Sequence, residues 1–260
     1  MRELLLGLDI GSSSIKASVV DADTGRAVAS AQSPSEEMEM LAPQHGWAEQ
    51  DPEMWWQHMV ISARSALQQS AAKPDEVKAI GISYQMHGLV VVDKNLQPLR
   101  PSIIWCDSRA VKIGQDACEA LGQSYCLGHF LNSPGNFTAS KLKWVKDNEP
   151  AIFDRIHKMM LPGDYIAMRL SGDVVTTDTG LSEGIFWDYS ADGVSDKLLQ
   201  HFGFDRKLLP DVVPVFGVQG KLTQRAASEL GLRAGAIIGY RAGDQPNNAF
   251  SLNVLKPGET

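Results

Sequence analysis

An aspartate beside a Gly-Ser turn is the first feature of the chain that could do chemistry. Asp9 ends an apolar run, and Gly11 follows it with the serines Ser12, Ser13 and Ser14. Backbone N–H groups and hydroxyls in such a turn can bind a phosphate, and the carboxylate can hold Mg²⁺ or one of its waters. A β-hairpin with a polar turn explains the same residues without a ligand. The turn alone therefore leaves both interpretations open.

Three further polar side chains follow apolar runs that are typical of buried strands. His87, Asp107 and Asp244 each lie just beyond such a run. Ligands of α/β proteins bind at the ends of strands, so we expect these residues to lie with Asp9 at one edge of a sheet. An imidazole there can hydrogen-bond a hydroxyl, and a carboxylate can accept a proton.

The start of the chain predicts strands followed by a helix. An antiparallel meander of three strands is predicted at 4–10, 15–21 and 26–32. Asp51 and Pro52 then predict the start of a helix, because Asp caps free N–H groups and Pro fits the first helical position. Trp55 and Trp56 lie on the apolar stripe of this helix, and we expect both of them in the core.

The rest of the chain alternates predicted strands and helices. The run 77–83 predicts a buried strand, with 89–93 as its returning partner. Further strands are predicted at 102–105 and 236–240, and helices at 138–147, 150–156, 163–170, 195–202 and 221–230, with another that ends at Leu121. This alternation predicts an α/β fold.

Composition favours small molecules as partners. The 260 residues carry a formal charge of −7 and contain no basic tract, which argues against binding nucleic acid through its phosphates. The apolar runs have the length of strands, so neither a membrane span nor a secretory signal is expected. Three cysteines without paired Cys-x-x-Cys spacing fit a reducing, cytoplasmic location. The spacing of Cys126 and His129 matches no common zinc module.

Five short motifs occur in an order that resembles one family, the FGGY carbohydrate kinases. The motifs are Asp9–Ser14, Gln85–Gly88, Trp105–Arg109, Phe137–Val145 and Gly243–Gln245. The Gln-Met-His-Gly loop and the segment Trp47–Pro52 most resemble the xylulokinase branch. The resemblance covers essentially the whole chain, and five motifs in order are far more specific than one.

The resemblance implies an actin-like, ribonuclease-H-like lobe in which a mixed sheet is flanked by helices. It implies that residues 1–260 form the N-terminal, sugar-binding domain, and that the lobe with the adenosine pocket lies outside this chain. We therefore expect little activity from this chain alone. ATP and Mg²⁺ are the implied cofactors, and a sugar and ATP are the implied partners. The resemblance is also compatible with a homodimer.

The implied catalytic residues are Asp244 and Asp9. Asp244 would accept the proton of the attacking hydroxyl, and a helix N-cap is its alternative role. Asp9 would hold Mg²⁺, through water. The phosphate would be bound by Ser12, Ser13, Ser14 and Lys16, although Lys16 could instead point to solvent.

The implied sugar contacts are Met86, His87, Trp105, Asp107 and Gln245. His87 would hydrogen-bond a hydroxyl or ketone oxygen, and Met86 would form an apolar wall. Trp105 could stack on a sugar face. Asp107 could accept sugar hydroxyls or cap the helix that it introduces, and the neighbouring Arg109 could pair with an acid instead of a ligand.

The segment Phe137–Val145 is expected to pack, with Lys141 solvated or in a salt bridge. Three departures from the family pattern are Asn136, Ser14 and Gln245, and the last of these resembles glycerol kinases. The implied reaction is phosphorylation of a ketopentose by ATP, with D-xylulose favoured and xylulose 5-phosphate as product. The alternatives are a kinase for ribulose, glycerol or gluconate, and an actin-like, nucleotide-dependent regulatory or assembly protein.

Overall fold

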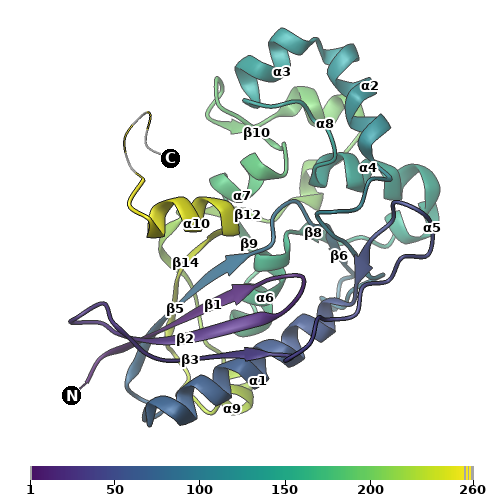
Figure 1. The fold of residues 1–260 in the computed structure, drawn as a ribbon. Helices are drawn as coiled ribbons and strands as arrows, with labels where there is room; N and C mark the ends of the chain where they lie inside the picture. The colour runs from purple at the N-terminus through teal and green to yellow at the C-terminus, as the bar shows by residue number, and fades with distance from the viewer. Residues whose placement is uncertain (1, 255, 257, 259–260) are drawn as a thin grey trace.

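A six-stranded mixed sheet forms one half of the molecule in the computed structural model, which describes residues 2–254, 256 and 258 (Figure 1). The strand order is β13-β14-β5-β1-β2-β3. Strands β1, β2 and β3 form the expected antiparallel meander, while β5 pairs in parallel with both β1 and β14. The strands are β1 (Leu4–Ile10), β2 (Ile15–Asp21), β3 (Ala27–Ser33), β5 (Val77–Tyr84), β13 (Phe216–Lys221) and β14 (Ile237–Gly243).

Helix α1 (Pro52–Ser70) packs against β2 and β3 and covers one face of this sheet with α6 (Pro162–Ser171) and α9 (Gln224–Leu230). The carboxylate of Asp51 accepts the N–H of Glu53 at 2.9 Å, as expected of a cap. Trp55 and Trp56 are buried in the core, which confirms the prediction. Alternate residues of β1 point into the same core, because successive side chains of a strand lie on opposite faces of the sheet. The spacing of apolar residues in the strand therefore determines which face of the sheet the helices cover.

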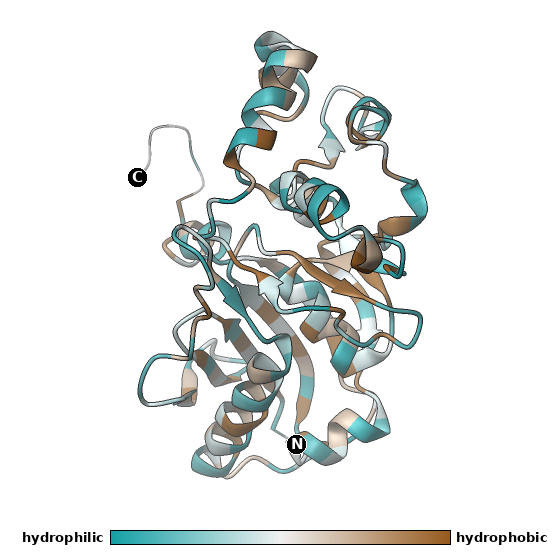
Figure 2. Cartoon of the chain, turned by 90° about the vertical axis from the view of Figure 1, so that its right-hand side faces the viewer, coloured by the Kyte–Doolittle hydropathy of each residue, from teal (hydrophilic) through white to brown (hydrophobic). Residues whose placement is uncertain are grey.

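A second, largely helical layer is built from the chain between β6 and η1, apart from α6, and encloses a core of its own. Figure 1 shows this layer above the sheet, and Figure 2 shows hydrophobic residues along the strands. Its helices are α2 (Val111–Leu121), α3 (Gln123–His129), α4 (Thr138–Asn148), α5 (Pro150–Phe153), α7 (Asp178–Glu183), α8 (Asp196–Phe202) and the 3-10 helix η1 (Arg206–Leu208).

The strand at 89–93 was expected to return beside β5, and that prediction is wrong. The strand found there, β6 (Val90–Val92), pairs antiparallel with β8 (Lys158–Met160), more than 60 residues further along the chain. The loop after β5 turns the chain out of the large sheet at this point. The other short pairs are β4 (Glu49–Gln50) with β7 (Ser102–Ile103), β9 (Val175–Thr177) with β12 (Asp211–Val213), and β10 (Trp187–Asp188) with β11 (Gly193–Val194).

Helix α10 (Asp244–Ser251) follows β14 directly and ends the described secondary structure. Over the described residues, no helix combines the length and the apolar character that crossing a membrane requires. The two ends of the predicted domain, residues 1 and 260, lie outside the described residues.

Candidate functional site

The parallel pairing of three strands brings the predicted site residues to one edge of the sheet. Asp9 pairs with Ser83, and Tyr84 lies between Ile10 on β1 and Gly243 on β14. Because parallel strands share their carboxyl ends, the residues after Tyr84 and Gly243 emerge beside Asp9. The loop with Met86 and His87 and the start of α10 at Asp244 therefore meet the N-terminal hairpin.

The tip of the N-terminal hairpin is held by its neighbours. The side-chain amide of Gln50 donates to the carbonyl of Ser12 at 2.7 Å, and the indole N–H of Trp105 donates to the Ser12 hydroxyl at 3.2 Å. A Cβ atom on Gly11 would lie 2.8 Å from the Ser14 carbonyl oxygen, so the turn needs a glycine here. Trp105, a predicted sugar contact, thus lies against the predicted phosphate turn.

Lys16 faces Asp9 across the hairpin. The two residues pair directly between β1 and β2, and the Lys16 ammonium lies 3.8 Å from a carboxylate oxygen of Asp9. Both side chains remain partly exposed, so this pair adds little to stability. An ammonium at this place can nevertheless meet a phosphate that enters above the turn.

Asp244 is the first residue of α10 and is half-buried. One of its carboxylate oxygens accepts the N–H of Gln245 at 2.8 Å, while the Gln245 side chain is exposed. Burial raises the pKa of Asp244 above its ordinary value, and the charge of Asp9 raises it further. A carboxylate whose pKa is raised toward neutrality is better suited to accept a proton from a hydroxyl.

Asp9→Asn is expected to lower the pKa of Asp244, because it removes the negative charge that raises it. Carbon-detected NMR titration of the Asp244 carboxyl would measure the shift. Asp21→Asn is a matched control, because Asp21 lies at the end of β2 far from Lys16, the residue that pairs with Asp9. It should leave the titration of Asp244 unchanged. An Asp244 curve that does not respond to Asp9→Asn would contradict the proximity of the two carboxylates.

Acidic residues at this edge fit Mg²⁺ binding. Mg²⁺ is usually held by one or two carboxylates, with waters and phosphate oxygens as its other ligands. Asp9 is partly exposed, and its charge acts on Asp244, so the two carboxylates could share such an ion. Within the described part of the chain, no cluster of three or more His, Cys, Asp or Glu side chains offers an all-protein site.

His87 lies in the loop after β5 with a backbone φ of 62°, a value that a non-glycine residue adopts only when its surroundings hold it there. Its ring atom Nδ1 lies 3.1 Å from the carbonyl oxygen of Glu183, and its ring packs edge-on against Phe137. Burial lowers the pKa of His87 to about 4, and the nearby charge of Lys141 contributes to this shift. The imidazole is therefore neutral at neutral pH.

Met86 packs against the backbone that carries Asp244. A Cβ atom on Gly243 would lie 2.4 Å from Cγ of Met86 and 2.8 Å from a carboxylate oxygen of Glu183. Only glycine permits the loop after β5 to approach β14 this closely. The Met86 and Gly243 contact thus joins the predicted sugar loop to the predicted catalytic aspartate.

Asp107 is fully buried, and its carboxylate is occupied by protein groups. It accepts the N–H of Ala48 at 2.6 Å and the N–H of Arg109 at 2.9 Å, and it also pairs with the Arg109 guanidinium. Arg109 in turn pairs with Glu49 at 2.6 Å and stacks on Trp47, so it binds acids as one interpretation predicted. Asp107 orders the turn before α2 but does not cap that helix, which has no side-chain cap. Its contact with a sugar stays a prediction.

Lys141 was expected to be solvated or in a salt bridge, and that prediction is wrong. Its side chain is fully buried, and its ammonium donates to the carbonyl of His87 at 2.8 Å. Burial lowers the pKa of Lys141 to about 7. The lysine lies on the same side of α4 as the buried Thr138, Leu142 and Val145, and this spacing was the available signal.

Glu183 is a buried residue of the site that no sequence pattern singled out. Its backbone carbonyl binds the His87 ring, and its side chain lies beside Gly243 and shares a hydrogen bond with Tyr84. Burial and the charge of Asp164 raise its pKa well above the ordinary value. It comes from α7, a short helix whose nearness to β14 arises only from the tertiary fold.

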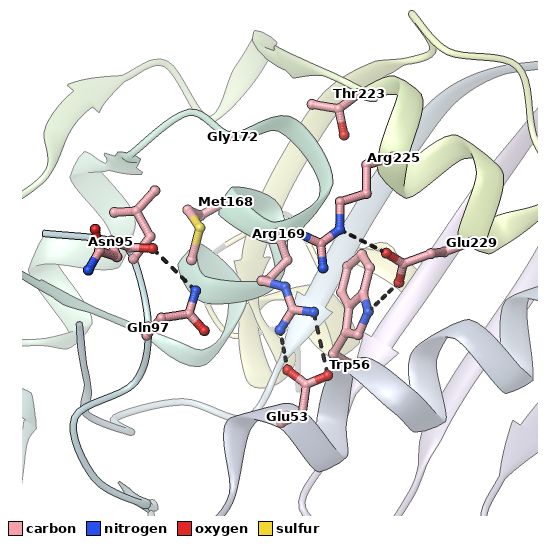
Figure 3. A pocket seen from close by; sticks show the side chains of 11 residues that line it. Glu53, Trp56, Asn95, Gln97, Met168, Arg169, Gly172, Thr223, Arg225 and Glu229 are labelled. Atoms are coloured by element: carbon pink, nitrogen blue, oxygen red, sulfur yellow. Dashed lines mark hydrogen bonds and ion pairs between the residues drawn. The ribbon is translucent and has the colours of Figure 1, made fainter. Parts of the chain in front are cut away.

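A cavity of about 400 Å³ lies elsewhere, between α1, α6 and α9 (Figure 3). Its charged side chains pair with one another, as Arg169 does with Glu53 and Arg225 with Glu229. The indole N–H of Trp56 also donates to Glu229, at 2.8 Å. None of the predicted site residues lines this cavity, and its polar groups are explained by helix packing.

Comparisons with known proteins place the chain among sugar kinases. The family model "FGGY family of carbohydrate kinases, N-terminal domain" matches residues 4–251. Xylulose kinases of Streptomyces rubiginosus and Klebsiella pneumoniae are 34% and 31% identical, and each alignment covers 98% of this chain and 51% of the relative. The crystal structure of a xylulose kinase from Brucella ovis matches with a TM-score of 0.87 at 31% identity, over 98% of this chain and 52% of that one. The chain spans about half the length of the curated relatives that it matches.

Proposed function

The chain belongs to the FGGY family of carbohydrate kinases, and from this premise we propose that it supplies the sugar site and the catalytic base of a kinase that phosphorylates D-xylulose with ATP. The named relatives at 31% and 34% identity are xylulose kinases, which supports D-xylulose over other sugars. We propose that the adenosine is bound by a second lobe, as the coverage of only half of each relative suggests.

One observation carries the proposal, namely the meeting of Asp9, His87 and Asp244 at the carboxyl ends of β1, β5 and β14. Phosphoryl transfer needs an attacking hydroxyl in line with the γ-phosphate, positive charge near the phosphates, and a group that accepts the hydroxyl proton. Asp244 offers the proton acceptor and His87 a hydrogen-bonding group for the sugar. Lys16, which faces Asp9 across the hairpin, offers the positive charge. A regulatory or assembly protein would have no use for the His87 loop.

The residues take separate roles in the proposed reaction. His87 binds a sugar hydroxyl, Met86 forms an apolar wall, and Trp105 offers its exposed ring to a sugar face. Asp244 takes the proton from the hydroxyl that attacks the phosphate. Lys16 and the backbone of the Ser12–Ser14 turn bind phosphate oxygens. Mg²⁺, when bound, would be held by Asp9 and would neutralise charge on the phosphates.

Calorimetric titration with D-xylulose, L-ribulose and glycerol tests the proposed substrate class. We expect the chain to prefer D-xylulose, and we expect His87→Ala to weaken that binding by about tenfold, the effect of losing one positioned hydrogen bond. His157→Ala is a control, because His157 lies beside β8 and its N–H binds the carbonyl of Val92, outside the site. Equal heats for the three ligands, or no change in His87→Ala, would contradict the assignment.

A further inference from the structure

The loop that carries His87 is held from one side by helix α4. Two successive carbonyls of the loop accept hydrogen bonds from this helix: the ammonium of Lys141 lies 2.8 Å from the His87 oxygen, and the hydroxyl of Thr138 lies 3.4 Å from the Gly88 oxygen. Both helix side chains are fully buried. A Cβ atom on Gly88 would lie 2.6 Å from the ring of Pro162, so the loop is also tightly packed from below.

The same helix is tied to the residue that holds the imidazole. The first turn of α4 donates the N–H of Ala139 to the carbonyl of Gly184 at 3.0 Å. The preceding carbonyl, of Glu183, lies 3.1 Å from Nδ1 of His87. Helix α4 therefore fixes both the backbone of His87 and the partner of its ring.

The partner of Nδ1 decides which tautomer His87 adopts. A carbonyl oxygen can only accept a hydrogen bond, so Nδ1 must carry the proton in the contact with Glu183. The ring is neutral, which leaves the lone pair of Nε2 as an acceptor. A sugar hydroxyl is the kind of donor that this atom would bind.

We infer that Lys141 is a positioning residue that holds His87 in its left-handed backbone conformation, so that Nε2 of the ring accepts a hydrogen bond from a hydroxyl of the sugar. The inference rests on the proposed function for the identity of the ligand, but not for the conformation of His87. An apolar side chain would fill the same space without the free-energy cost of burying an ammonium. Lys141 donates a hydrogen bond to the carbonyl of His87, a residue in a left-handed backbone conformation. This bond explains why a lysine occupies the position.

The charged and titratable groups that face Lys141 come from two separate segments, the turn at 106–109 and helix α7. Asp107, Cys106 and Glu183 favour its charged form, while burial and Arg109 disfavour it. The charge of Lys141 in turn lowers the pKa of His87. Replacing the lysine with an uncharged residue should therefore raise the pKa of His87 and release the loop.

NMR of the ring nitrogens of His87 tests this inference. In the wild-type chain we expect the Nδ1-protonated tautomer and an inflection of the ring signals as Lys141 titrates, at a pKa of about 7. In Lys141→Met we expect a mixture of tautomers, a higher pKa of His87, and affinity for D-xylulose about tenfold weaker by calorimetry. Lys143→Met, on the same helix but in a surface pair with Asp147, should change none of these quantities.

Two outcomes overturn the inference. One is a folded Lys141→Met variant with an unchanged His87 pKa and tautomer. The other is an Nε2-protonated ring in the wild-type chain, which remains measurable if the variant does not fold. If the wild-type chain shows the expected tautomer and inflection but binds no D-xylulose, the proposed function fails while the positioning role of Lys141 stands.

Discussion

Asp244→Asn is expected to lower the turnover number for phosphorylation of D-xylulose by about 10²–10⁴-fold, the usual contribution of a positioned general base. The amide keeps the shape of the carboxylate and its contact with the N–H of Gln245, but it cannot take the proton of the attacking hydroxyl. Affinity for the sugar should change by less than about tenfold, because His87 and Trp105 make the proposed binding contacts. The measurement is kcat and KM in a kinase-active polypeptide that contains this chain.

The alternative role of Asp244 as a helix N-cap is wrong, because Gly243 holds that position. A purely structural role at the first position of the helix has a matched control in Asp178. Asp178 is the first residue of α7, and its carboxylate accepts the N–H of Thr179 at 2.8 Å, the same contact that Asp244 makes with Gln245. Asp178→Asn should leave kcat unchanged. Equal small effects of the two substitutions would assign Asp244 to helix stabilisation and would remove it from the reaction.

The pH profile gives a second readout of Asp244. Activity that needs the ionised carboxylate falls as the pH drops through its pKa, which burial and Asp9 raise above the ordinary value. The acid limb of the wild-type profile should therefore lie above the range of an exposed aspartate. This limb should be absent from the residual activity of Asp244→Asn.

Local signals were sufficient to predict the elements that carry the site. Short apolar runs predicted β1 and β2 with their observed bounds, and Asp51 with Pro52 predicted the start of α1. The actin-like, ribonuclease-H-like lobe implied by the family resemblance is confirmed by the mixed sheet and by the solved sugar-kinase structures that match it. In these segments, side-chain periodicity and capping agree with the tertiary fold.

Local sequence signals could not predict which strands pair when they are far apart in the chain. A strand of three residues such as β6 shows only that it is apolar, and nothing local distinguishes β5 from β8 as its partner. The arrival of Glu183 beside Gly243 likewise depends on how α7 packs above the sheet, whereas the burial of Lys141 had a local signal in its spacing from the buried residues of α4. Lys141 was expected to be solvated or in a salt bridge because buried charges are rare, and this expectation failed because a tertiary hydrogen bond holds its ammonium in the interior.

The buried polar groups behind Asp244 form a connected support for the end of β14. Arg241, two residues before Gly243, pairs with Asp164 of α6 at 3.0 Å and donates to the carbonyl of Val175 at 2.9 Å. Both members of the ion pair are almost completely buried. The charge of Asp164 acts on Glu183, whose side chain in turn lies beside Gly243. Stability and the placement of the proposed base thus depend on the same residues.

Arg241→Met is accordingly expected to lower the free energy of unfolding by about 3–5 kcal/mol at neutral pH, because it leaves Asp164 buried without its partner. Burial already raises the pKa of Asp164, and loss of the arginine removes the charge that lowers it. The folded variant then binds a proton that the unfolded chain releases, so its stability falls as the pH rises through the ordinary pKa of aspartate toward neutrality. Urea unfolding followed by circular dichroism at about pH 5 and about pH 7.5, both above the ordinary pKa of aspartate, should give the lower stability at the higher pH.

Two variants separate loss of the buried pair from a general effect of removing an arginine. Arg206→Met breaks an exposed pair with Asp196 and should cost less than about 1 kcal/mol at either pH. Arg241→Met combined with Asp164→Leu removes both buried charges, and it should recover part of the lost stability because no unpaired carboxylate remains. If the double variant were less stable than Arg241→Met alone, the contacts of Asp164 with α6 and β9, rather than its charge, would be what anchors the strand that presents Asp244.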